Sequence, residues 1–198
     1  MKKTILLLFL VPFLQGSPSS DTPEDAANQF YSTVLAVNEK GCLPDENELR
    51  RLAPFMSKRL TALLRDALKY REQFIKDHPP KRTKEGYLIH DKPPFIDGDC
   101  FSSNVEGVTR FTRGKSQESN GRYRIDLNLV YIDKMSLYKP FAWTDAVIAI
   151  KEEGRFVVDD MEFLGDWPYG NHGLLSKSIE ATKKSGRQMN RKQSPGFD

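Results

Sequence analysis

The sequence contains little cysteine and little histidine, and this limits the metal sites that it can build. Two cysteines and three histidines occur among 198 residues. A four-ligand zinc site of the common kind cannot be completed from them without carboxylates. Glycine, at 13 residues, and proline, at 12, are too few for a collagen-like or low-complexity chain. The composition therefore predicts one ordinary soluble domain, and we expect no metal ion and no cofactor.

The chain also lacks a strong excess of charge of one sign. Thirty Lys and Arg residues against 27 Asp and Glu residues leave a net charge of +3. Two of the positive charges, Lys2 and Lys3, lie in a segment that we expect to be removed, which leaves the mature chain near +1. A protein that binds nucleic acid through electrostatics needs a marked basic excess on one surface. We therefore expect no nucleic-acid partner.

No complete catalytic motif occurs in the chain. No serine lies in a glycine-flanked nucleophile elbow, no cysteine and histidine lie close in sequence, and no glycine-rich phosphate loop is present. The sequence therefore assigns no catalytic residue.

What is present at the N-terminus is the pattern of a secretory signal peptide. Lys2 and Lys3 precede an apolar run over 5–14, and small residues follow over 15–20. The apolar run is too short to span a bilayer, which takes about 20 residues. We predict a signal peptide over 1–19 with cleavage near Gly16 or Ser19, a single domain over 20–183, and a disordered basic tail over 184–198. We expect a periplasmic or secreted location, without a transmembrane segment after cleavage.

Export decides how the two cysteines, Cys42 and Cys100, are interpreted. In an oxidising compartment a lone pair of cysteines is most simply a structural disulfide. The alternative is two free thiols, one of them reactive, because sequence cannot show whether the two residues come within reach. The predicted cleavage zone itself contains no cysteine to which a lipid could be attached.

Four segments carry helical signals. Thr22 and Pro23 are typical of a helix start, and Gly41 offers a stop. Asp45 and Glu48 have the spacing of a capping box for a second helix. A third helix is predicted from Ser57 to about residue 78, before two prolines. A last helix is predicted over about 174–183.

Later in the chain the hydrophobic period changes from 3.6 residues to 2. Strict alternation predicts a strand over 122–132, a weaker strand is predicted over 105–113, and a further hairpin is predicted from 143–152 and 155–164. The segment 81–103 is irregular, so it is either functional or contains an undetected strand. Helices followed by strands predict an α+β fold, with N-terminal helices packed on a curved antiparallel sheet.

Several short strings give the chain a family resemblance between about residues 22 and 175. The matching strings are Pro93–Asp99, Phe101–Ser103, Glu106–Gly107, Trp143–Val147 and Gly154–Asp160. With them the chain resembles an uncharacterised family of bacterial envelope proteins whose domain is similar to the nuclear transport factor 2-like (cystatin-like) cone. The resemblance implies that fold and an envelope location. It implies no agreed activity, and some members of the family look like lipoproteins.

Two groups of residues are candidate sites. Asp97 and Asp99 flank a glycine on a loop, where they could hold a hard cation or simply stabilise a turn. A second candidate group combines carboxylates with possible partners, namely Asp160, Asp159, Asp145, Tyr123, Arg124 and Trp143. One interpretation is a pocket in which Asp159 or Asp160 is a general base and a tyrosine is a donor. The other is a buried structural network, because adjacent strand residues face opposite sides and an inward carboxylate needs a partner.

These observations favour a non-enzymatic role. We expect binding of an unknown envelope protein or small ligand through the concave face of the sheet. One alternative is a small cone-fold enzyme that uses acid–base chemistry, similar to isomerases or dehydratases. Another is a toxin-neutralising interaction protein. The basic tail fits contact with anionic lipid, although a solvated tail is the simpler interpretation.

Overall fold

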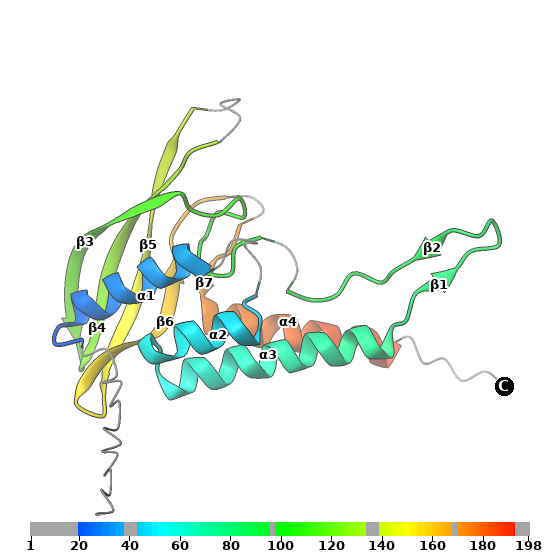
Figure 1. The fold of residues 1–198 in the computed structure, drawn as a ribbon, viewed down its shortest axis with the longest axis horizontal. Coiled ribbons are helices and arrows are strands. Elements are labelled where there is room, and N and C mark those ends of the chain that lie inside the picture. The colour runs from blue at the N-terminus through cyan, green and yellow to red at the C-terminus, as the bar shows by residue number, and fades with distance from the viewer. Residues whose placement is uncertain (1–19, 38–42, 96–97, 134–138, 168–169, 193–198) are drawn as a thin grey trace, which may run out of the picture.

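In a computed structural model of the chain, four α-helices and seven strands are described (Figure 1). The described residues are 20–37, 43–95, 98–133, 139–167 and 170–192. The helices are α1 (Pro23–Val37), α2 (Glu46–Leu52), α3 (Lys58–Asp77) and α4 (Leu175–Lys192), and a 3-10 turn, η1, spans Ala53–Phe55. The strands are β1 (Lys81–Arg82), β2 (Leu88–Ile89), β3 (Arg110–Ser119), β4 (Arg122–Tyr131), β5 (Phe141–Glu152), β6 (Arg155–Phe163) and β7 (Gly173–Leu174).

The main sheet is an antiparallel five-stranded sheet in the order β3-β4-β5-β6-β7. Two-residue turns join β3 to β4 and β5 to β6. Both residues of each turn have positive φ: 52° and 71° at Asn120 and Gly121, and 50° and 85° at Glu153 and Gly154. Positive φ at both positions is the geometry that matches the twist of paired strands. The structure therefore confirms the predicted α+β class with an antiparallel sheet.

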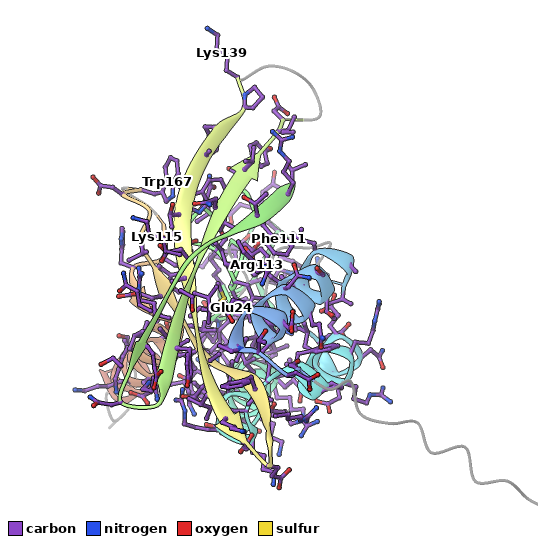
Figure 2. All side chains as sticks on the ribbon, turned by 90° about the vertical axis from the view of Figure 1, so that its left-hand side faces the viewer. Glu24, Phe111, Arg113, Lys115, Lys139 and Trp167 are labelled. Carbon is purple, nitrogen blue, oxygen red and sulfur yellow. The ribbon has the colours of Figure 1, made fainter. Side chains whose placement is uncertain are left out.

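Helix α1 covers the inner face of this sheet. Phe30, Tyr31 and Val34 of α1 are buried against a core that includes Ile125 and Leu127 of β4. Figure 2 views the sheet nearly edge-on and shows Phe111 and Arg113 on the α1 side, with Lys115 on the opposite side. The alternation predicted for 122–132 is confirmed, because the buried residues Ile125, Leu127 and Leu129 recur with a period of two.

Local capping explains where α2 and α3 begin. The Asp45 carboxylate accepts hydrogen bonds from the backbone N–H groups of Asn47 and Glu48, and the Glu48 carboxylate accepts one from Asp45 N–H. The Ser57 hydroxyl caps α3 by accepting from Leu60 N–H. Helix α3 ends at Asp77, before the two prolines, as the sequence predicts.

Element boundaries differ from the prediction at β3 and α4. Strand β3 spans Arg110–Ser119 rather than 105–113, and a bulge between Arg113 and Ser116 holds one extra residue of this strand. The irregular segment after α3 contains a separate two-stranded sheet of β1 and β2, in line with the alternative of an undetected strand. Helix α4 extends to Lys192 rather than ending near residue 183. Lys, Arg, Gln and Met, which make up most of residues 184–192, are good helix formers, so the lack of an apolar stripe there did not mark the end of the helix.

A bulge in β6 shifts its side-chain pattern. Ile148 pairs with Asp160 and Ala149 with Val158, so Asp159 is the extra residue. Val158 before the bulge and Met161 after it both belong to the core. The regular alternation expected for this strand therefore does not hold, and both adjacent aspartates, 3% and 2% exposed, are buried.

No helix within the described ranges is both long enough and apolar enough to cross a membrane. The predicted signal peptide lies outside those ranges, as do residues 193–198 of the predicted tail.

Candidate functional site

The structure separates the second candidate group into three places. Asp159 and Asp160 lie at the bulge of β6, Asp145 and Trp143 lie on the inner face of β5, and Arg124 lies on the outer face of β4 with Tyr123 next to it on the inner face.

Asp159 is held in an ionic cluster between the sheet and the start of α3. Its Oδ1 accepts from the Ser57 hydroxyl at 2.7 Å and from Arg59 Nε at 2.9 Å, and its Oδ2 accepts from Arg122 Nη2 at 3.1 Å. Burial raises the pKa of this carboxyl, but the hydrogen bonds from Arg59 and Ser57 and the charges of Arg59 and Arg122 lower it further than burial raises it. A carboxylate held ionised by two guanidinium groups is a poor proton acceptor.

Asp160 caps the start of α4. Its Oδ2 accepts from the Ser176 hydroxyl at 2.6 Å, and its Oδ1 accepts from the N–H groups of Ser176 and Met161 at 3.1 and 2.9 Å. Unpaired N–H groups in the first turn of a helix need such acceptors. Asp160 therefore ties β6 to α4.

Asp145 holds a buried loop against β5. Its Oδ2 accepts from Ser103 N–H at 2.8 Å and from Trp143 Nε1 at 3.1 Å, and its Oδ1 accepts from Leu164 N–H at 2.9 Å. The Trp143 ring packs edge-on against Trp167 at 5.9 Å between centroids. Three donors on a fully buried carboxylate satisfy it internally.

Tyr123 and Arg124 are similarly engaged. The Tyr123 ring packs edge-on against Phe156 at 5.2 Å. Arg124 forms ion pairs with Glu162 at 2.6 Å and with Asp126 at 2.5 Å. The six residues are therefore not brought together around one cavity, and none of them lines either pocket described below.

The other candidate, the loop around Asp99, lines a pocket against α4. The pocket has a volume of about 270 Å³. It lies between residues 92–95 and 98–100 on one side and α4 on the other, and it is called the α4 pocket below. Its apolar walls are Leu43, Pro93, Pro94, Phe95, Leu175 and Ile179, and its polar lining includes Lys92, Asp99, Cys100, Asn171, Ser178 and Thr182.

Asp99 is the buried carboxyl of the α4 pocket. It is 5% exposed, and its Oδ1 accepts from Phe101 N–H at 2.8 Å. Burial raises the pKa of Asp99 to about 6, although the Phe101 hydrogen bond opposes this, and the charge of Asp145 raises it further. Asp99 thus changes protonation state near neutral pH inside a pocket.

Hydrogen bonds hold the described loop residues from Asp99 to Ser102 in place. The Asn171 side-chain amide donates to the carbonyl groups of Asp99 and Ser102, both at 2.7 Å. The buried Tyr31 hydroxyl donates to the Phe101 carbonyl at 3.0 Å. The loop is therefore connected to both α1 and the segment before β7, and Asp99 and Cys100 line the pocket.

Two predicted site residues lie outside the described residues, namely Asp97 and Cys42. No disulfide is found among the residues that the structure describes, and because Cys42 lies outside them, the predicted disulfide between Cys42 and Cys100 stays a prediction. Cys100 lies beside Asp99 in the lining of the α4 pocket. The presence of two cysteines in a sequence cannot show whether they meet the geometric requirements of a bridge.

Sequence reasoning missed the α4 side of this pocket. Asn171, Leu175, Ser178, Ile179 and Thr182 come from the loop and helix about 70 residues after Asp99. The sequence predicts a helix over about 174–183, but nothing in the neighbouring residues indicated which loop this helix would pack against.

A second pocket of about 280 Å³ lies between the start of α3 and the β5–β6 turn. It is lined by charged residues that include Lys58, Arg65, Glu152, Glu153 and Arg155. Lys58 and Glu153 form an exposed ion pair across it. Because its lining is dominated by exposed charges, with Lys58 and Glu153 already paired at the surface, this pocket is the weaker candidate.

No group of three or more His, Cys, Asp or Glu side chains within the described part of the chain is arranged to hold a metal ion. Asp99, one of the two carboxylates that the sequence predicts as a possible cation site, lies in a wall of the α4 pocket.

Comparison with known proteins gives one distant relative. No family model matches the sequence. The uncharacterized lipoprotein YbjP of Escherichia coli (strain K12) is 24% identical over 158 residues, which make up 80% of this chain and 75% of that protein. A solved structure of a protein of unknown function from Bacteroides thetaiotaomicron covers 70% of this chain and 89% of its own, with 13% identity and a TM-score of 0.32. That structural similarity is too low to carry an argument, so the expected cone fold is not confirmed.

Proposed function

We propose that this protein is exported to the cell envelope and binds a small amphipathic ligand in the α4 pocket without transforming it. The observation that carries the proposal is the pocket itself, which combines apolar walls with one buried carboxyl whose pKa is raised to about 6. Small-molecule sites are typically apolar hollows with a few placed polar groups.

The size of the pocket limits the ligand. A volume of about 270 Å³ lies just below the usual range of about 300–1,000 Å³ for ligand pockets. A fragment-sized molecule, such as one aromatic ring system with a polar end, therefore fits better than a nucleotide cofactor. Phe95, Leu175 and Ile179 would contact its apolar part.

The polar lining favours a hydrogen-bonding head group. Ser178 and Thr182 lie one helical turn apart on α4, and Asp99 lies in the opposite wall. Near neutral pH the Asp99 carboxylate accepts hydrogen bonds, and below about pH 6 the neutral acid also donates one. We therefore favour a ligand with a neutral or cationic donor at its polar end over an anion.

This proposal places the ligand elsewhere than on the concave face of the sheet. The centre of that face is filled, since Ile125, Leu127 and Met161 are fully buried under α1. The acid–base alternative, which follows from the resemblance to the nuclear transport factor 2-like cone, requires a carboxylate that faces a cavity from the sheet. Asp145, Asp159 and Asp160 each accept several hydrogen bonds, which favours a structural role for them.

Export is the second part of the proposal. It is supported by the signal-peptide pattern over 1–19 and by the distant relative that is named a lipoprotein. The first cysteine of this chain is Cys42, so the predicted cleavage zone offers no thiol for lipid attachment. We therefore propose an exported protein that does not carry an N-terminal lipid.

The pocket can be tested by filling it. In Ser178→Phe a phenyl ring occupies the space between α4 and the loop, whereas in Ala181→Phe the same ring points into solvent from the same helix. The probe is N-phenyl-1-naphthylamine, a neutral amphipathic amine whose fluorescence rises in an apolar site. We expect the purified protein and Ala181→Phe to increase its fluorescence and Ser178→Phe to lose at least about tenfold in affinity.

Circular dichroism and thermal unfolding of both variants check that the fold is intact. The proposal is overturned if the unmodified protein does not bind the probe. It is equally overturned if folded Ser178→Phe binds it as well as Ala181→Phe does.

A further inference from the structure

The hairpin of β1 and β2 stands apart from the rest of the molecule. Its two strands pair only with each other, and they extend beyond the far end of α3 (Figure 1). Three consecutive large apolar side chains are exposed here, with Tyr87 73%, Leu88 56% and Ile89 55% exposed. Such a run on a projecting element is unusual, because isolated exposed apolar residues are common but contiguous ones mark contact sites.

The register shows that both faces of the hairpin have the same character. Arg82 pairs with Leu88, and Lys81 pairs with Ile89, so each pair lies on one face and the two faces are opposite. Each face therefore presents one cation beside one apolar side chain. A flat protein surface would contact only one face of the hairpin. The head-group region of a lipid bilayer would contact both faces of a hairpin inserted into it.

The charges around the apolar run are mainly positive. Lys81, Arg82, Lys84 and Lys92 are opposed by Glu85 and Asp91 within the same segment. Arg82 is directed toward the tip, where its guanidinium donates to the Gly86 carbonyl at 2.8 Å. Lys81 lies 3.9 Å from Asp91 at the base.

The adjoining end of α4 adds further positive charge. Residues 183–192 contain five Lys and Arg residues and no Asp or Glu. Helices α3 and α4 are in contact, with Lys183 paired to Asp66, and they run toward the same end of the molecule as the hairpin (Figure 1). The exposed apolar side chains and the cations of the hairpin thus lie at the end of the molecule toward which this basic stretch of α4 runs, while the α4 pocket lies nearer the sheet.

We propose that this end of the molecule docks on an anionic phospholipid bilayer, with the side chains of Tyr87, Leu88 and Ile89 inserted among the head groups. Aromatic and aliphatic side chains bury their apolar area at that depth, and the surrounding cations are attracted to lipid phosphates. The inference does not depend on ligand binding in the α4 pocket, because none of the three apolar residues lines it.

The experiment is co-sedimentation of the exported protein with two kinds of vesicles, phosphatidylcholine with phosphatidylglycerol and phosphatidylcholine alone. We expect binding to the anionic vesicles only, weakened by high salt. In Leu88→Ser/Ile89→Ser we expect at least about tenfold weaker binding, because the apolar area is lost. In Lys81→Gln/Arg82→Gln we expect about fivefold weaker binding for each charge removed.

The matched control is Val105→Ser/Leu164→Ser, which removes two exposed apolar side chains from the body of the protein. It should bind vesicles as the unmodified protein does. Failure of the unmodified protein to bind anionic vesicles overturns the proposal, as does unchanged binding by Leu88→Ser/Ile89→Ser. A photo-crosslinker at position 88 that captures a protein and no lipid from envelope membranes would assign the hairpin to a protein partner instead.

Discussion

At the scale of single residues, four buried aspartates differ because their neighbours differ. Asp145 has three donors, Asp160 caps a helix, and Asp159 is paired with guanidinium groups. For Asp99, burial outweighs its hydrogen bond from Phe101, and its pKa rises to about 6. The same side chain thus joins elements of the fold at three positions, and at the fourth its burial raises the pKa.

This difference predicts how stability depends on pH. In the folded protein the pKa of Asp99 is about 6, above its ordinary value of 3.8. The folded state therefore binds the proton more tightly than the unfolded state. Its free energy of unfolding should fall as pH rises from about 4 to above 6, by about 3 kcal/mol from this group. In Asp99→Asn this fall should disappear, while the amide oxygen still accepts from Phe101 N–H.

Urea unfolding at several values between pH 4 and pH 8 measures this contribution. Asp21→Asn, at an exposed position, is the matched control and should retain the pH dependence of the unmodified protein. An Asp99→Asn variant with the same slope as that control would show that Asp99 does not titrate as described.

At the scale of elements, some helices and strands are specified by local sequence signals, whereas others depend on contacts between residues far apart in the chain. Residues close together in the sequence provide the capping box of α2, the Ser57 cap of α3 and the alternation of β4. The predicted elements form at these places. The start of α4 is different, since its cap is Asp160, 16 residues away on β6. No sequence pattern near α4 contains that information.

Removing this cap should loosen α4. In Asp160→Ala the first-turn N–H and the hydroxyl of Ser176 lose their acceptor, which should lower the free energy of unfolding by about 2 kcal/mol or more. Glu180→Ala removes a carboxylate of an exposed ion pair on the same helix and should cost less than about 0.5 kcal/mol.

Chemical denaturation measures both variants, and hydrogen exchange reports on the α4 amides directly. Faster exchange at the start of α4 is expected in Asp160→Ala alone. If the two variants lose equal stability and α4 stays equally protected, Asp160 does not anchor this helix.

At the scale of the whole molecule, both proposals depend on where the protein is located. Ligand binding in the α4 pocket and docking on a phospholipid bilayer are both proposed to take place outside the cytoplasm, so both require that the chain is exported. The predicted signal peptide over 1–19 is a property of the sequence, and the name of the distant relative points in the same direction.

Export has a direct test. When the chain is produced in a bacterium with its own N-terminus, the periplasmic fraction should contain a protein that begins after residue 16 or 19. Leu8→Arg interrupts the apolar stretch, so this variant should remain in the cytoplasm with its full mass. Mass spectrometry of the two fractions provides the measurement. A periplasmic protein that keeps its first residue, or a processed Leu8→Arg variant, would contradict the assignment.

The sequence by itself determined the fold class, most helix and strand positions and the expectation of export. These follow from helix caps, from the spacing of hydrophobic residues, and from the cationic and apolar segments of the predicted signal peptide. All of these signals involve residues that are close together in the chain. It also singled out Asp99 and the prolines before it. It could not locate the bulge at Asp159, because an inserted residue is defined only relative to the partner strand.

Only the tertiary structure decided what these residues do together. The α4 pocket exists because residues 92–95 and 98–100 meet the side of a helix that begins at Leu175. The candidate carboxylates on β5 and β6 became separate structural centres for the same reason, since each meets a different distant element. Burial, partner and pKa are set by contacts across the fold, and no spacing along the chain specifies them.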